Sequence, residues 1–151
     1  MNEFDMTGKT VIVTGASYGL GVSWASALAD YGADIVATAR NEDKLQETKA
    51  LIEGKGRQCL TVGCDVREYD QVEALMKAAW DEFGTVDVLI NNAGIADPRG
   101  FRSEHSDIDL YNDIVATDLN GLWYCCRASA QHFLRQGHGN IINISSIFGI
   151  G

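Results

Sequence analysis

Short runs of apolar and β-branched residues alternate with helical patterns along the whole chain. The first run is Thr10–Thr14, and a helical pattern over 19–31 follows it directly. The other predicted strands lie at Asp34–Ala39, 58–63, 86–90 and 140–145. Parallel strands need long crossover connections, usually helices, so this alternation predicts β-α-β units with right-handed crossovers. The expected fold is α/β, a parallel sheet with helices on both faces.

The helical segments carry apolar residues at helical spacing, which predicts their inner faces. In the third segment these residues are Val72, Leu75, Met76, Ala79, Trp80 and Phe83. Asn41 is the predicted N-cap of the second segment. The predicted inner face of that segment consists of Leu45, Thr48, Leu51 and Ile52. A long helix is predicted over 107–136, with an inner stripe of Ile108, Tyr111, Val115, Leu119, Leu122 and Cys126.

Charge and cysteine content argue against several classes of function. The 151 residues carry a formal net charge of −9 and contain no run of Lys or Arg, so we expect no binding of nucleic acid. The four cysteines form no C-x-x-C pair, so we expect no metal site and reduced, mostly buried thiols. No stretch approaches the roughly 18 apolar residues of a membrane span. Residues 1–9 lack an apolar signal segment, and we therefore expect a cytoplasmic protein with no membrane association.

Glycines cluster where the first predicted strand meets the first helix. They stand at positions 15, 19 and 21, directly after Thr14. Glycine permits a sharp turn out of the strand, a close approach of backbone to a diphosphate, and close packing of helix on strand. The N-terminus of the following helix adds free N–H groups and the positive end of the helix dipole. Within a β-α-β unit, this spacing predicts a site for the phosphates of a dinucleotide.

Five motifs, in order along the chain, resemble the classical short-chain dehydrogenase/reductase family. They are Thr14-Gly15-x-x-x-Gly19-x-Gly21, Asp65-Val66, Asn91-Asn92-Ala93-Gly94, Asp118-Leu119-Asn120-Gly121 and Asn143-Ile144-Ser145-Ser146. The resemblance implies a Rossmann-type doubly wound parallel sheet with strand order 3-2-1-4-5, truncated after strand five. Residues 1–151 would then form an incomplete NAD(P)-binding domain. The implied activity is hydride transfer between a nicotinamide cofactor and a small carbonyl or alcohol, and the full-length form is expected to be a homo-oligomer.

The resemblance also implies which residues bind the cofactor. They are Gly15, Ser17, Tyr18, Gly19, Leu20, Arg40, Asp65, Val66, Asn92, Ala93 and Gly94. Asp65 matches the family aspartate that hydrogen-bonds adenine, with the backbone of Val66 beside it. The turn that begins at Asn91 is implied to steady the sheet and to flank the adenosine ribose.

The end of the second strand indicates which nicotinamide cofactor is preferred. An acidic residue there binds the adenosine ribose hydroxyls of NAD in the family, but this chain has Ala39 followed by Arg40. Because a guanidinium can hold a 2′-phosphate bidentately, we expect NADP(H) to be favoured over NAD(H). The family's other basic position holds Tyr18, so this expectation depends on Arg40 alone. The alternative is that Arg40 simply faces water.

The same resemblance assigns part of the chemistry. Ser146 is implied to hydrogen-bond the substrate oxygen, with Ser145 as the less favoured candidate, and Asn120 is implied to fix a water that links to a lysine. In the family a Tyr-x-x-x-Lys pattern beyond strand five supplies the acid. None of the five tyrosines here precedes a lysine at that spacing.

We therefore expect the chain to be the amino-terminal portion of an enzyme and to be inactive alone. Two alternatives stay open at this point. One is a non-catalytic dinucleotide-binding module, and the other is an interaction protein that uses the same scaffold without a cofactor.

Overall fold

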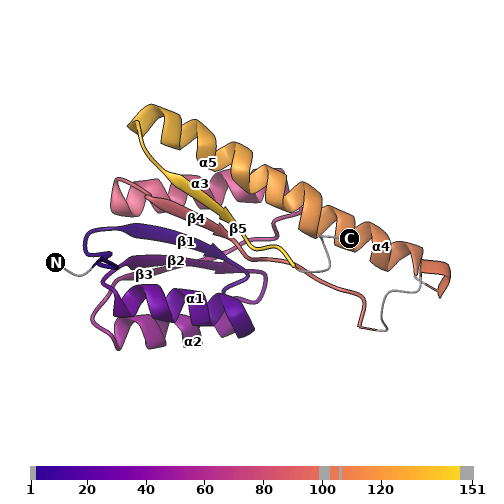
Figure 1. Ribbon diagram of the computed structural model, residues 1–151, viewed down its shortest axis with the longest axis horizontal. Coiled ribbons are helices and arrows are strands. Elements are labelled where there is room, and N and C mark those ends of the chain that lie inside the picture. The colour runs from indigo at the N-terminus through magenta and orange to yellow at the C-terminus, as the bar shows by residue number, and fades with distance from the viewer. Residues whose placement is uncertain (1–2, 99–102, 106, 147–151) are drawn as a thin grey trace.

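A five-stranded parallel sheet lies between two helical layers in the computed structural model, which describes residues 3–98, 103–105 and 107–146 (Figure 1). The strand order is β3-β2-β1-β4-β5. The strands are β1 (Thr10–Thr14), β2 (Asp34–Ala39), β3 (Cys59–Gly63), β4 (Val88–Asn91) and β5 (Asn140–Asn143). The predicted doubly wound fold and its strand order are confirmed. Residues 1–2, 99–102, 106 and 147–151 lie outside the described residues.

The helices divide between the two faces of the sheet. On one face lie α1 (Gly19–Asp30) and α2 (Glu42–Glu53), and on the other lie α3 (Tyr69–Phe83) and a long helix (Figure 1). The long helix consists of α4 (Ile108–Ile114), the π-helical segment η2 (Val115–Gly121) and α5 (Leu122–Gln136). A short 3-10 turn, η1 (Ser103–His105), precedes it.

The central strand β1 is buried along its whole length because both of its faces are covered. Val11 and Val13 point into the core that α1 and α2 complete, whereas Ile12 points into the core beneath α3 and α5. Successive side chains of a strand alternate between its faces, so one continuous apolar run supplies both cores. This is why the run at 10–14 could be recognised as a doubly covered strand.

The second helix begins as predicted, but its inner face is narrower than predicted. The Asn41 side chain accepts a hydrogen bond from the backbone N–H of Lys44 at 3.1 Å, which confirms it as the N-cap. Leu45 and Ile52 are fully buried, whereas Leu51 is 42% exposed, so its predicted place on the inner face is wrong. Adjacent residues of a helix point in directions about 100° apart. Because Ile52 points inward, Leu51 points away from the core.

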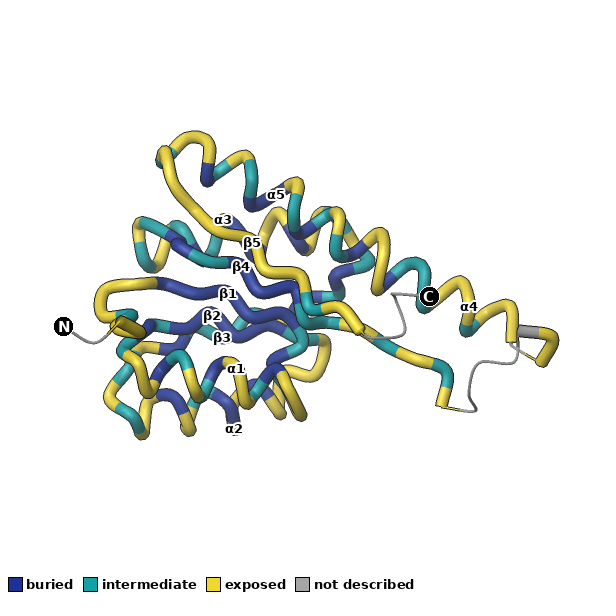
Figure 2. Tube along the Cα trace, viewed as in Figure 1, coloured by how far each residue is buried: buried dark blue, intermediate teal, exposed yellow. Residues whose placement is uncertain are grey.

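The long helix departs most from the prediction. It contains the π-helical segment η2, and Ile108, Tyr111 and Leu119 of the predicted inner stripe are exposed. The buried positions Thr117, Gly121 and Cys125 follow one another four residues apart, so the core-facing stripe lies on a different side of the helix from the predicted one. The long helix also extends past the sheet at its α4 end, where no described residue is buried (Figure 2). The residues that face the core are Thr117, Gly121, Cys125, Ala128, Ser129 and Phe133.

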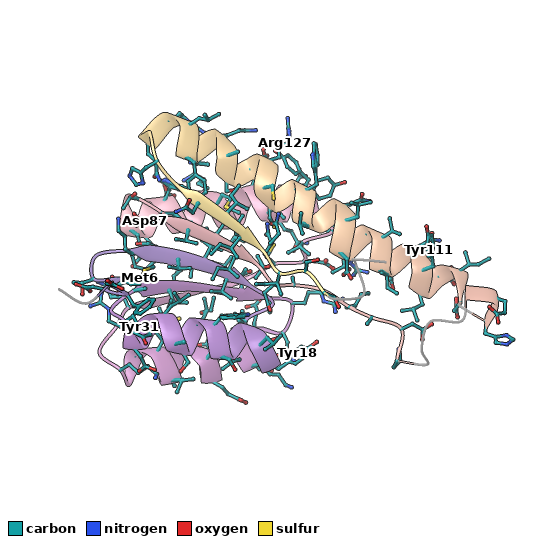
Figure 3. The ribbon with its side chains drawn as sticks, viewed as in Figure 1. Met6, Tyr18, Tyr31, Asp87, Tyr111 and Arg127 are labelled. Atoms are coloured by element: carbon teal, nitrogen blue, oxygen red, sulfur yellow. The ribbon has the colours of Figure 1, made fainter. Side chains whose placement is uncertain are left out.

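The two ends of the sheet differ in how they are closed. At the amino ends of the strands, the buried carboxylate of Asp87 accepts hydrogen bonds from the Thr10 backbone N–H at 3.0 Å and from Lys9 Nζ at 2.8 Å. Tyr18 lies toward the opposite end of the sheet from Asp87, beside the carboxyl ends of the strands (Figure 3). Ligands of open α/β sheets bind at that end.

Gly121 brings η2 against the loop that follows β3. An added Cβ would lie 2.7 Å from Val66 Cγ2 and 3.1 Å from the Val66 carbonyl oxygen. We expect Gly121→Ala to lower the free energy of unfolding by about 1–3 kcal/mol because of this overpacking. Helix propensity alone would raise it by up to about 1 kcal/mol. Chemical denaturation decides the sign, and a stabilised Gly121→Ala protein would contradict the packing described here.

Candidate functional site

The carboxyl ends of β1 and β4 are joined by the side chain of Thr14. Its hydroxyl donates to the Ile90 carbonyl at 3.4 Å and accepts from the backbone N–H groups of Asn92 and Ala93, both at 3.0 Å. The Asn92 amide returns a hydrogen bond to the Thr14 carbonyl at 3.0 Å. These bonds fix the point from which the chain after β1 and the chain after β4 depart to opposite faces of the sheet.

The glycine turn after β1 fits closely against this junction. Gly15 has a φ of +68°, and an added Cβ would lie 2.9 Å from Ala93 Cα. At Gly21 an added Cβ would lie 2.1 Å from the Gly15 carbonyl oxygen. Only glycine meets both requirements, a left-handed backbone at the turn and direct contact of helix with turn.

The N-terminus of α1 is open to an anion. Its N-cap, Tyr18, makes no side-chain hydrogen bond to the helix, and the first turn carries no acidic residue. The first backbone N–H groups of an α-helix have no partner within the helix, and the helix dipole adds positive potential there. The geometry around α1 therefore suits a phosphate group.

A cavity of about 760 Å³ lies at this end of the sheet. It brings together most of the predicted cofactor-binding residues, namely Gly15, Ser17, Tyr18, Arg40, Asp65, Val66, Ala93 and Gly94. Three predicted residues do not line it. Gly19 and the exposed Leu20 begin α1, and Asn92 faces inward to the Thr14 junction.

The cavity also includes residues that sequence reasoning did not single out. The first turn of α2 contributes Glu42, Asp43 and Lys44, and the long helix contributes Thr117. The ammonium group of Lys44 lies 5.9 Å from the centre of the Tyr18 ring. In the sequence, Lys44 follows Arg40 by four residues and stands at the start of a predicted helix. This second cation was the signal that could have pointed to Lys44 as a site residue.

Asp65 is held in place by Arg67. Arg67 Nε lies 3.0 Å from both carboxylate oxygens of Asp65, and Nη2 lies 2.6 Å from Oδ2. Hydrogen bonds from the Arg67 side chain hold the pKa of the Asp65 carboxyl below its usual range. The carboxylate at the edge of the cavity is therefore ionised and fixed in direction.

The π-helical segment presents Asp118 to the loop after β4. Asp118 Oδ1 accepts a hydrogen bond from the Ile95 backbone N–H at 2.9 Å and lies near Gly94. Burial raises the pKa of Asp118, and the hydrogen bond from Ile95 opposes that shift. Sequence reasoning missed this residue, although it stands in the same motif as Asn120. π-Helical turns occur often at functional sites.

The two predicted catalytic residues do not line the cavity. Asn120 and Ser146 are both exposed, and their catalytic roles stay predictions. Asn91 is buried and donates from Nδ2 to Asn143 Oδ1 at 2.9 Å, so it joins β4 to β5. Cys64, at the cavity wall, is buried, and burial raises the pKa of its thiol to about 11.

Two further features of the described residues bear on the class of site. Among them, no three histidine, cysteine or acidic side chains are grouped so as to hold a metal ion. Within the same part of the chain, no helix is both long enough and apolar enough to cross a membrane.

Comparison with known proteins agrees with this geometry. A family model described as short chain dehydrogenase matches residues 9–150. The chain belongs to the short-chain dehydrogenase family. Gluconate 5-dehydrogenase of Gluconobacter oxydans is 36% identical over 144 residues, covering 95% of this chain and 56% of that protein. NADP-dependent mannitol dehydrogenase of Alternaria alternata is 37% identical over 150 residues, covering 97% and 56%.

A solved structure shows the same fold. Carveol dehydrogenase from Mycobacterium avium in complex with NAD superposes with a TM-score of 0.89 at 27% identity, covering 96% of this chain and 57% of that one. This short-chain dehydrogenase chain spans about half the length of the curated relatives that it matches.

We expect Asp118→Asn to stabilise the protein at neutral pH. The pKa of Asp118 is raised in the native state, so the protonated carboxyl stabilises the native state below the ordinary pKa of an aspartic acid. That stabilisation is lost as the pH rises through the raised pKa of the native state. Asparagine can still accept from Ile95 without the cost of burying a charge. Because solvent screens this partly exposed group, the expected gain at pH 7 is only about 0.5 kcal/mol.

Denaturation at a series of pH values checks this prediction, and the gain should disappear near pH 3. Asp109→Asn in the first turn of α4 is the matched control. It should be neutral or slightly destabilising, because an acid is favoured at a helix start. A loss of stability in Asp118→Asn at pH 7 would contradict the assignment.

Proposed function

We propose that the protein is an NAD(P)(H)-dependent oxidoreductase that interconverts a small carbonyl compound and an alcohol by hydride transfer. The observation that carries the proposal is the cavity at the carboxyl ends of the strands. The glycine turn, Arg40 and Asp65 all line this cavity. The names of the related gluconate and mannitol dehydrogenases support the reaction class. When bound, the nicotinamide ring would supply or accept the hydride.

The residues present fit a dinucleotide. The uncapped N-terminus of α1 offers N–H donors for the diphosphate, and Gly15, which carries no side chain, lines the cavity beside it. Asp65 and Val66 line the same cavity and would receive the adenine, and Ala93 and Gly94 would flank the ribose.

We propose NADP(H) as the preferred cofactor. Ala39 ends β2 and offers no acid to the ribose hydroxyls, and Arg40 follows it at the cavity wall. Within the described residues, the Arg40 guanidinium forms no hydrogen bond or ion pair, so its donors are available to a 2′-phosphate. Lys44 adds a second cation nearby. Glu42 and Asp43 lie in the first turn of α2, where their charges interact favourably with the helix dipole. The 2′-phosphate would therefore interact with Arg40 and Lys44.

For the reaction itself we propose that Ser146 hydrogen-bonds the substrate oxygen and that Asn120 positions a water. The acid that protonates the alkoxide is assigned to a tyrosine with a nearby lysine outside these 151 residues. The complete protein is proposed to be a homo-oligomer. Large apolar side chains exposed on the long helix, including Ile108, Leu119 and Trp123, support this proposal.

Arg40→Asp should reverse the cofactor preference. It removes the partner of the 2′-phosphate, places a like charge against it, and offers an acceptor to the ribose hydroxyls of NAD(H). Titration followed by the fluorescence of the reduced cofactor gives both dissociation constants. We expect the unmodified protein to bind NADPH at least about tenfold more tightly than NADH, in line with one charged hydrogen-bonded contact.

The control for charge is Lys49→Asp, which makes the same change on α2 at a residue that does not line the cavity. It should leave the preference for NADPH unchanged. An unmodified protein that binds NADH more tightly than NADPH would refute the proposed cofactor preference. Failure to bind either cofactor would refute the proposed function.

A further inference from the structure

Arg67 stands directly behind the carboxylate at the edge of the cavity. It does not itself line the cavity. Its backbone N–H donates to Asp65 Oδ1 at 3.0 Å, and its side chain spans both oxygens of the same carboxylate. A guanidinium that engages a carboxylate through two nitrogens fixes the plane of that carboxylate as well as its charge. The direction in which Asp65 can accept a further hydrogen bond is therefore set by Arg67.

The far side of the guanidinium is anchored to the long helix. Arg67 Nη1 donates to Asp113 Oδ1 in α4 at 2.8 Å. A second contact holds the same loop, because Gly121 of η2 packs directly against Val66. The segment Asp65-Val66-Arg67 is thus held by the helix at Val66 and at Arg67, although the residues in contact lie about fifty positions apart in the sequence.

We propose that Arg67 is a positioning residue that makes the cavity selective for a 6-aminopurine over a 6-oxopurine. This inference rests on the proposed binding of a dinucleotide with its adenine against Asp65. An ionised carboxylate accepts from the 6-amino group of adenine but has no donor to meet at the 6-oxo group of hypoxanthine. A carboxylate that Arg67 holds in place cannot turn to find one.

Selectivity depends on this fixed direction and not on the charge alone. Hypoxanthine carries a proton on N1, next to its 6-oxo group, and a mobile carboxylate could turn to accept from it. Removal of Arg67 would therefore improve the relative binding of hypoxanthine. It would also remove one positive charge near the cavity, which weakens both dinucleotides equally and cancels in the ratio of their dissociation constants.

The test compares NADPH with its reduced hypoxanthine analogue, which differs only in the purine. Both are titrated by nicotinamide fluorescence against the unmodified protein and against Arg67→Gln. The matched control is Arg57→Gln, because Arg57 pairs with Asp34 at 2.8 Å with similar exposure but lies outside the cavity lining. We expect the unmodified protein and Arg57→Gln to prefer the adenine form by about tenfold or more. Arg67→Gln should reduce that preference to about threefold or less.

Each other outcome overturns a defined statement. If the unmodified protein binds neither dinucleotide, the proposed function fails and this inference fails with it. If it prefers adenine and Arg67→Gln retains the full preference, the role of Arg67 is overturned. If the unmodified protein binds both dinucleotides without preference, the purine selectivity itself is overturned while the proposed function stands. Circular dichroism reports folding of the variants. Should Arg67→Gln not fold, Arg67→Lys keeps the charge without the bidentate geometry and must also lower the preference.

Discussion

The hydroxyl of Thr14 binds the carboxyl ends of β1 and β4 to each other, and the candidate site is built outward from that contact. This one hydroxyl forms hydrogen bonds with two backbone N–H groups and one carbonyl. It lies where the chain leaves two neighbouring strands toward opposite faces of the sheet. The crevice at such a divergence is where open α/β sheets bind ligands. Gly15 fits closely on Ala93 beside the same junction and Gly21 fits closely on Gly15, because neither glycine position has room for a side chain.

The π-helical segment η2 closes the inner side of this crevice. Asp118 contacts the loop after β4 through the Ile95 N–H, Gly121 contacts the loop after β3 through Val66, and Thr117 lines the cavity between them. Thr117, Asp118 and Gly121 are positions i, i+1 and i+4 of the helix, so all three lie on one side of it. One side of this segment therefore contacts both loops and lines the cavity.

Sequence reasoning was most successful where a single local rule decides the structure. Val11, Ile12 and Val13 form a continuous apolar run, typical of a strand covered on both faces, and Asn41 carries the side chain of an N-cap. It was least successful where distant segments meet. The exposed Leu119 was assigned inward because its apolar side chain matched a helical stripe, whereas the buried face runs through the smaller residues Thr117 and Gly121. The ion pair of Arg67 with Asp113 joins residues 46 positions apart, and no spacing rule predicts such a pair.

The central claim is that the crevice beside the Thr14 junction receives a nicotinamide dinucleotide, and a crystal structure of the protein grown with NADPH tests it most directly. The account predicts the diphosphate at the N-terminus of α1, the adenine against Asp65 and Val66, and the 2′-phosphate within hydrogen-bonding distance of Arg40. Density for the cofactor elsewhere on the molecule, or a saturated crystal with an adenine that does not contact Asp65, would contradict it.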